Sequence, residues 1–328
     1  FIRKVIAGTL LVEGIGALLY MTVFIPEFGV KGVWISLFNA VSAFCNAGMD
    51  VISENSLYAY VHNPVINLVT ILLIVFGGIG YIVWWDLVGA LKNIRRQRLR
   101  CFTNLTLHSK IALSVTGILI LAGTAAVFVF EYNNPLTIGS FSIFDKLQAS
   151  LFQSVTTRTA GFATIPQEDL TNASAITSLL LMFIGGSPVG TAGGIKTVTF
   201  AVLITSAFAT MKTHAEAELF HRTIPKHAVS KAVAVVSMAF IILFTATLLL
   251  SAVTDADALD VVYETVSAAA TVGLTRSLTS ELNIWGRIII IITMYLGRVG
   301  PISLMIALNT KKETKNIIKN PTEDISVG

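Results

Sequence analysis

The sequence predicts an all-α integral membrane protein built from repeated units, each with a span, a short pore helix, a filter loop and a second span. Hydrophobic residues make up 54% of the 328 positions and charged residues only 13%, whereas a soluble domain has roughly a quarter charged residues. The windows 65–85, 111–130 and 232–254 contain no Asp, Glu, Lys or Arg, and windows of about 20 such residues cross the bilayer as helices. They are apolar all round, whereas strands of a membrane barrel alternate.

A similar segment recurs three times and ends each time near a glycine. Gly48, Gly161 and Gly273 are 113 and 112 residues apart, and each lies between two long apolar stretches. The segments are 42–49, 154–162 and 267–274. This spacing predicts repeats over residues 1–98, 106–214 and 225–312, followed by a cytoplasmic tail at 313–328.

Each repeat is expected to contain a span, a short helix and a second span. In chain order these are 5–25, 33–44 and 64–91; then 111–130, 144–156 and 173–211; then 228–253, 258–267 and 285–308. Helices of ~10–13 residues are too short to cross a bilayer and fit re-entrant segments. Non-helical backbone at membrane depth is tolerated only in protein or beside water, so three such loops predict a shared aqueous pathway.

The glycine loops have the features of a cation filter. Backbone carbonyls replace the water shell of the ion in potassium filters, glycine adopts positive φ at little cost, and the C-terminal end of each short helix favours a cation. The alternative role of any single glycine is to let two membrane helices pack closely, without forming part of a filter. The filter, with K⁺ at its carbonyl oxygens, is predicted at Asn46, Ala47, Gly48, Thr159, Ala160, Gly161, Thr271, Val272 and Gly273.

A second glycine-rich segment interrupts the span at 173–211. As one helix this span would be about 58 Å long at ~1.5 Å per residue, nearly twice the ~30 Å hydrocarbon core. Its glycines and proline forbid a regular helix, so we expect a loop below the filter that gates the pore. A passive kink is the alternative, and the P-loop spacing of a phosphate site is absent. The predicted gate comprises Gly185, Gly186, Ser187, Pro188, Gly190, Thr191, Ala192, Gly193, Gly194, Lys196 and Arg298.

Charged residues inside predicted spans are expensive and usually paired or facing a cavity. Arg298, in the middle of the last span, and Lys196 are expected to bind carbonyls of the gating loop. Glu13 is expected to pair across repeats, and Arg158 to hold the outer mouth through acidic partners. For each, a purely structural ion pair is the alternative.

The distribution of Lys and Arg predicts the orientation. The links between repeats and the tail are basic, whereas the loops inside repeats are acidic, so the links and the C-terminus are expected in the cytoplasm. An acidic outer vestibule would concentrate cations. The links also offer a docking surface for a cytosolic protein, at Arg95, Arg96, Arg98 and Arg222.

The chain resembles the Trk/Ktr/HKT superfamily of potassium transporters, and within it the KtrB-type membrane subunits. The resemblance covers the whole chain and lies in the single glycine of each filter loop, the strings Thr-Ala-Gly-Phe and Thr-Val-Gly-Leu, the segment 185–197 and Arg298. It implies four repeats around a pseudo-fourfold pore, so a fourth repeat is expected upstream of Phe1. The repeats here would be the second to fourth.

The resemblance also implies the function and the partners. It implies K⁺ uptake driven by the membrane potential in a bacterial inner or plasma membrane, dependence on Na⁺, and a gating loop beneath the filter. It implies a homodimer in membrane lipid, on a cytosolic RCK ring of the KtrA type that binds the nucleotide. Because each loop has one glycine, we expect weaker discrimination of K⁺ from Na⁺ than the five-residue filter gives.

Two other classes compete with a channel-like pore. A cation symporter working by alternating access uses broken helices, but it predicts inverted repeats, whereas these repeats share one orientation. An intramembrane enzyme would need a nucleophile with its base or a set of metal ligands, and the sequence has neither pattern. No nucleic-acid partner is expected, because the excess positive charge lies in particular loops.

Overall fold

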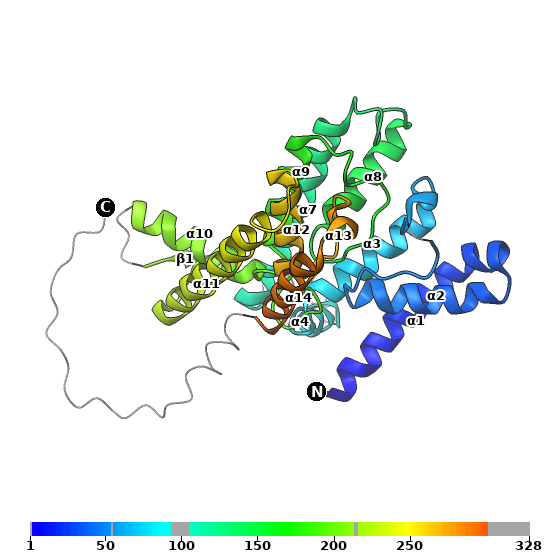
Figure 1. Ribbon diagram of the computed structural model, residues 1–328. Helices are drawn as coiled ribbons and strands as arrows, with labels where there is room; N and C mark the ends of the chain where they lie inside the picture. The colour runs from blue at the N-terminus through cyan, green and yellow to red at the C-terminus, as the bar shows by residue number, and fades with distance from the viewer. Residues whose placement is uncertain (1, 54, 93–104, 213–215, 301–328) are drawn as a thin grey trace, which may run out of the picture.

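The computed structural model describes residues 2–53, 55–92, 105–212 and 216–300. The described chain is almost entirely helical (Figure 1). The predicted tail 313–328, residues 301–312 of the last repeat, and the docking residues Arg95, Arg96 and Arg98 lie outside the described ranges.

The first part of the chain forms a helical hairpin and a bent helix pair. α1 (Ile2–Phe28) and α2 (Lys31–Phe44) pack along each other, and the turn between them contains Gly29 at φ 60°. A short 3₁₀ turn, η1 (Tyr58–Tyr60), precedes α3 (Pro64–Ile79), whose first amides are capped by the side chain of Asn63. α4 (Tyr81–Lys92) follows directly.

The prediction of one continuous span over 64–91 is wrong, because α3 and α4 meet at an angle of 101°. Gly80 causes the break: its φ is 93°, which is outside the helical region and open to glycine alone at low cost. A Cβ atom on Gly80 would lie 2.4 Å from the Pro188 carbonyl oxygen. The bend therefore exists where a distant segment approaches the backbone.

The second part contains the predicted broken span. α7 (Leu107–Glu131) is followed by the short α8 (Ile143–Thr156), α9 (Asn172–Phe183) and α10 (Thr197–Met211). Thr106, Ser142 and Thr171 each cap one of these helices by accepting from a backbone N–H of its first turn. The predicted interruption of the span 173–211 is confirmed by the break between α9 and α10.

The third part begins with a small hairpin that the hydrophobic pattern does not predict. β1 (Glu218–Leu219) pairs with β2 (Arg222–Thr223) through a tight turn in which Phe220 and His221 both have positive φ. It is followed by α11 (Lys226–Ser251), α12 (Ala258–Ala270), the single turn α13 (Leu278–Glu281) and α14 (Ile284–Val299). The span predicted over 285–308 is described only to Gly300, where φ is 79°.

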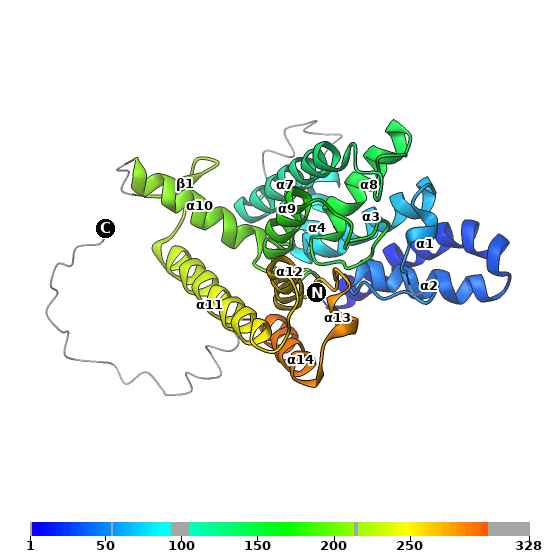
Figure 2. The same cartoon turned by 45° about the horizontal axis from the view of Figure 1, so that its top comes forward.

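The short helices α2, α8 and α12 are buried toward their C-terminal ends, where α2 ends in Ser42–Phe44 and α8 in Phe152–Thr156. α3 packs on α1, α2 and α8, whereas α12 packs on α9, α11 and α14. α1 and α2 lie at the opposite side of the molecule from α10 and α11 (Figures 1 and 2). The largest core cluster joins Tyr20 and Phe24 of α1 to Phe44 of α2 and Phe152 of α8.

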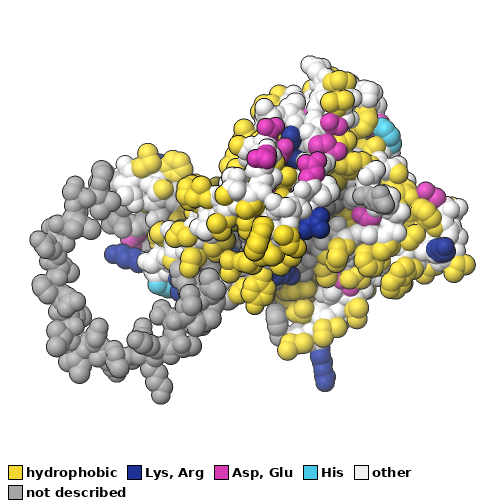
Figure 3. Space-filling model, in the orientation of Figure 1, with side chains coloured by type: hydrophobic (Ala, Val, Ile, Leu, Met, Phe, Trp, Pro, Cys, Tyr) yellow, Lys and Arg dark blue, Asp and Glu magenta, His cyan; other side chains and the backbone are white. Residues whose placement is uncertain are grey.

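The outer helices have the length and composition of membrane spans. Within the described chain, α1, α7 and α11 are each long and apolar enough to cross a membrane, and the bent pair α3–α4 is so as one unit. The most apolar windows of α1, α7 and α11 are only 28%, 22% and 11% buried, respectively. The exposed remainder is largely hydrophobic (Figure 3), as expected for side chains that face lipid.

We expect Gly80→Ala to lower the thermal stability of the protein in detergent. Positive φ costs a residue with a Cβ atom about 1–2 kcal/mol, and the new methyl group would collide with the Pro188 carbonyl. The midpoint of thermal unfolding measures the effect. Gly117→Ala is the matched control, because a Cβ atom on Gly117 in α7 meets nothing within 4 Å. Equal midpoints for the two variants would contradict the role of Gly80.

Candidate cation pathway and the loop beneath it

The three glycine loops share one backbone conformation. Each short helix ends one to three residues before a non-glycine residue with positive φ, and a glycine with positive φ follows two residues later. A non-glycine residue rarely adopts this conformation, so three repetitions indicate a common local geometry. The φ values are 51° at Asn46, 69° at Thr159 and 56° at Thr271, then 64° at Gly48, 89° at Gly161 and 93° at Gly273.

The three loops meet at one place, although 112 and 113 residues separate their glycines. A Cβ atom on Gly48 would lie 2.4 Å from the Ala160 carbonyl oxygen, and one on Gly161 would lie 2.3 Å from the Val272 carbonyl oxygen. The second loop therefore touches both of the others, with carbonyl oxygens at the contacts. α2, α8 and α12 end here, so the negative ends of three helix dipoles surround the same point.

The remaining side of this meeting point is open in the described chain. The first and third loops border a cavity of about 600 Å³, lined by Asn46 and Ala47 on one side and by Thr271 and Gly273 on the other. Arg298 of α14 lines the same cavity. The first and third glycine loops thus face an open space. The second glycine loop lies between them and is buried.

The segment 184–196, which we call the 184–196 loop, leaves and returns at neighbouring points. Ile184 and Ile195 form a β-bridge, and the Gly185 amide donates to the Ile195 carbonyl at 3.0 Å. The Thr197 amide donates to the Gly186 carbonyl, also at 3.0 Å. The loop is therefore closed at its base, and its tip extends from two joined ends.

The tip of the 184–196 loop lies against all three glycine loops. Thr191 Oγ1 lies 2.8 Å from Asn46 Oδ1 and 3.0 Å from the Phe44 carbonyl oxygen, as a donor to both. The Gly193 amide donates to Thr159 Oγ1 at 2.9 Å, and a Cβ atom on Gly193 would lie 2.0 Å from Thr271 Oγ1. The loop thus contacts the residue with positive φ at the start of every glycine loop.

The α3–α4 bend supports the other side of the 184–196 loop. The amides of Ser187 and Thr191 donate to the carbonyls of Gly78 and Gly77, at 2.8 and 3.1 Å. In return, the Tyr81 amide donates to the Val189 carbonyl at 3.1 Å. The unpredicted bend at Gly80 therefore supplies hydrogen bonds to backbone that belongs to no helix.

Three cationic side chains bind carbonyls of the 184–196 loop. Arg298 Nη1 donates to Thr191 O at 3.2 Å, Arg158 Nη2 to Gly185 O at 3.1 Å, and Lys196 Nζ to Ala192 O at 2.6 Å. The structure thus places Lys196 and Arg298 in contact with the 184–196 loop, which also contains the predicted gate residues from Gly185 to Gly194. Arg298 lies in the last turn of α14, and the rest of the span predicted over 285–308 lies outside the described residues.

One predicted charge contact is wrong, and another is not found among the described residues. Arg158 does not reach acidic residues at an outer mouth: its buried guanidinium donates to Gly185 O and lies 3.4 Å from Thr116 Oγ1. Glu13 forms no ion pair with any described residue, and its nearest recorded polar neighbour is Cys45 Sγ at 4.0 Å. Sequence alone identified both residues as unusual but not the direction in which their side chains extend.

A polar network that the sequence analysis missed links the second and third repeats. Gln153 Nε2 donates to Gln167 Oε1 at 2.7 Å, and the Tyr263 hydroxyl donates to the same oxygen at 3.0 Å. Arg276 Nη1 donates to the Gln167 carbonyl at 2.9 Å, while its Nε pairs with Asp260 at 2.6 Å. The signal available was the polar face of the short helix α8, where Lys146, Ser150 and Gln153 follow one another at helical spacing.

Acidic side chains gather over the region of α8, α9 and α13 (Figure 3). Asp145 and Asp260 lie in the first turns of α8 and α12, at the ends of these helices away from the glycine loops. The acidic charge therefore lies on the side of the glycine loops opposite to the 184–196 loop.

Comparison with known proteins is consistent with this geometry. The TrkH family model, described as a cation transport protein, matches residues 2–320. The chain is 39% identical to the Ktr system potassium uptake protein B of Bacillus subtilis over 97% of this chain and 69% of that protein. It is 38% identical to the potassium/sodium uptake protein NtpJ of Enterococcus hirae, with the same coverage of 97% and 69%.

A solved structure has the same fold. The potassium transporter TrkH from Vibrio parahaemolyticus superimposes with a TM-score of 0.70 at 18% identity, over 89% of this chain and 62% of that one. The chain therefore spans less than two thirds of the length of that structure. The family match over residues 2–320, together with the relatives above 30% identity, shows that this chain belongs to the TrkH family of cation transport proteins.

Proposed function

We propose that this chain mediates K⁺ uptake, driven by the membrane potential, through a channel-like pore. The observation that carries the proposal is the convergence of three loops with matching positive-φ glycines, whose carbonyl oxygens lie at the contacts between them. Two relatives are named as potassium and potassium/sodium uptake proteins. A cluster of carbonyls at the negative ends of three helices suits a partly dehydrated monovalent cation.

In this proposal the glycine loops form the filter, with K⁺ as the transported substrate at the backbone carbonyls of residues 46–48, 159–161 and 271–273. Each loop has one glycine, so it offers fewer carbonyl layers than a Thr-Val-Gly-Tyr-Gly filter. We therefore expect weaker discrimination of K⁺ from Na⁺. In a pseudo-fourfold ring, the glycine loop of a fourth repeat would occupy the cavity of about 600 Å³ between the first and third loops.

The 184–196 loop is the gate in this proposal. Its tip bonds to Asn46 and Thr159 at the inner ends of two filter loops and presses on Thr271 of the third. Arg298 adds a positive charge beside the pathway and holds the Thr191 carbonyl. A cation leaving the filter would meet this loop first, so opening requires these hydrogen bonds to break.

The setting follows from the resemblance and from the charge pattern. We propose a multi-pass protein of the bacterial plasma membrane, with the inter-repeat links and the C-terminus in the cytoplasm. It forms a homodimer and is regulated by a cytosolic ring of nucleotide-binding RCK subunits, and uptake depends on Na⁺. Arg222 and Lys226, which are exposed beside the hairpin between α10 and α11, offer part of the basic docking surface.

Gly161→Ala is expected to reduce rubidium uptake by at least about tenfold, which corresponds to ~1.4 kcal/mol of barrier. Gly161 has φ 89°, and its new methyl group would occupy the position of the Val272 carbonyl oxygen. Uptake of ⁸⁶Rb⁺ into proteoliposomes of the full-length protein measures the effect, with Gly117→Ala as the control. Full uptake by the Gly161 variant would contradict a filter at this position.

Deleting Ser187–Gly194 is expected to increase uptake. The deletion removes the tip of the loop and joins Gly186 to Ile195, beside the parallel β-bridge between Ile184 and Ile195 at the loop base. The same rubidium assay measures the change. Abolished uptake, or loss of coupled Na⁺ movement, would instead favour a symporter in which this loop binds the substrate.

Thr191→Val tests the contact between gate and filter more gently. The variant keeps the shape of the side chain and removes the donor to Asn46 and Phe44, a change of about 1 kcal/mol. We expect roughly fivefold faster uptake if this full amount stabilises the closed state. The control is Thr210→Val, because the Thr210 hydroxyl donates to the Ser206 carbonyl within α10, away from the gate. Equal uptake by both variants would show that Thr191 does not hold the gate.

A further inference from the structure

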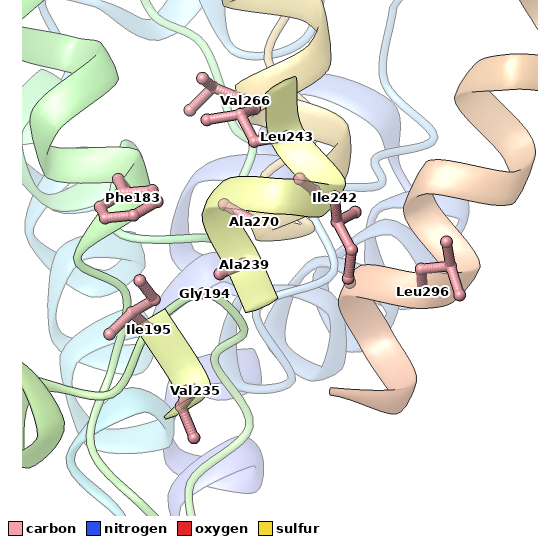
Figure 4. Close-up of a pocket in the computed structure, with 12 residues that line it drawn as sticks. Phe183, Gly194, Ile195, Val235, Ala239, Ile242, Leu243, Val266, Ala270 and Leu296 are labelled. Atoms are coloured by element: carbon pink, nitrogen blue, oxygen red, sulfur yellow. The ribbon is translucent and has the colours of Figure 1, made fainter. Parts of the chain in front are cut away.

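A second cavity lies on the opposite side of the 184–196 loop from the first glycine loop. Gly194 and Ile195 of the loop form one wall, and Val266 and Ala270 at the end of α12 form another (Figure 4). The remaining walls come from α11, through residues such as Val235 and Ala239, and from Leu296 of α14 (Figure 4). The cavity thus joins the loop to the last turn before the third glycine loop.

The walls of this cavity are mostly apolar, and their polar part comes from the backbone. None of the described residues that line it carries a polar or charged side chain. Its volume is about 50 Å³, whereas one water-sized group needs about 10–15 Å³. A buried water needs two to four polar partners, and apolar cavities stay dry. The matching occupant is a hydrocarbon group several carbon atoms long.

Apolar side chains lie between this cavity and the exposed face of α11. α11 has the smallest buried fraction of the candidate spans, 11% of its most apolar window. On its outward side, Phe240 is 56% exposed, and its ring packs on that of Phe183 at a centroid distance of 5.2 Å. Phe183 in turn lines the cavity. A chain of apolar side chains therefore runs from the lipid-facing surface of α11 to Ile195.

We propose that this cavity binds the hydrocarbon chain of a membrane phospholipid, with the chain end in contact with Gly194 and Ile195. The acyl chain enters from the face of α11 beside Phe183 and Phe240. The acyl chain supplies van der Waals contacts that the atoms lining an empty cavity lack. Closely packed protein interiors leave few voids of this size unfilled. The proposed site requires only that α11 faces lipid.

The position of the site gives it a regulatory consequence, which rests on the function proposed above. The acyl chain supports the 184–196 loop from the side opposite to its contacts with Asn46. A filled cavity then opposes movement of Gly194 and Ile195 away from the glycine loops. Lipids whose acyl chains do not reach the cavity would leave the 184–196 loop free to move. The rate of uptake would therefore depend on the length and shape of the lipid acyl chains.

Photolabelling tests the binding directly. The full-length protein is reconstituted in vesicles of phosphatidylethanolamine and phosphatidylglycerol that contain a phosphatidylcholine with a diazirine at its chain end. After irradiation, labelled residues are located by tandem mass spectrometry. Ile195 is the discriminating position, because it is only 5% exposed and bulk lipid cannot reach it. We expect label on Ile195 as well as on the exposed face of α11.

Two valine substitutions on α11 provide a matched pair. Val235→Trp fills the cavity, whereas Val233→Trp adds the same side chain on the exposed face, where Val233 is 48% exposed. We expect the Val235 variant to lose the label on Ile195 at least about fivefold and the Val233 variant to keep it. Ala239→Leu gives a milder filling substitution if the tryptophan variant does not fold.

The outcomes separate the binding site from its effect on the gate. Absence of label on Ile195 in the unsubstituted protein, with Phe244 on the exposed face labelled, would overturn the site. Equal labelling of Ile195 in the Val233 and Val235 variants would also overturn it. Rubidium uptake measured on the same vesicles tests the regulation, and a failure of uptake alone would count against the transport proposal rather than against the lipid site.

Discussion

The position of the 184–196 loop depends on satisfying backbone that belongs to no helix. Inside a membrane protein such backbone must find its hydrogen bonds within the protein, since lipid offers none. Here the loop receives them from the Gly77–Tyr81 bend, from Thr159, and from the cationic groups of Arg158, Lys196 and Arg298. The bend, the unusual positions of the charges and the contacts with the glycine loops are all consequences of this one requirement.

Close backbone approach imposes the second constraint. The glycine loops meet so tightly that a methyl group at Gly48 or Gly161 would overlap a neighbouring carbonyl. Similar contacts occur at Gly77, Gly185 and Gly193, around the 184–196 loop. Glycine at these positions therefore serves contact between segments as much as conformational freedom. Carbonyl oxygens brought together in this way form a polar centre inside an apolar protein, which is what a pathway for a dehydrated cation needs.

The two cavities beside the 184–196 loop differ in chemistry, and that difference divides their roles. The larger one is lined by glycine-loop backbone, Glu264 and Arg298, so its occupants are polar or belong to a polar interface. The smaller one is lined by aliphatic and aromatic side chains and lies behind Phe183, which packs on the exposed Phe240 of α11. In the functions proposed above, the loop would lie between a polar pathway and the lipid, so that conditions on either side act on the same few residues.

Hydrophobic patterning and glycine spacing by themselves determined the helical membrane class, the short helices α2, α8 and α12, and the break between α9 and α10. These features depend on local composition and on the thickness of the bilayer, which a sequence records directly. The α3–α4 bend, the inward direction of Arg158 and the contact of Glu13 with Cys45 were decided only by tertiary structure. Each depends on which distant carbonyl or amide comes within reach, and residue spacing carries no such information until the chain is packed.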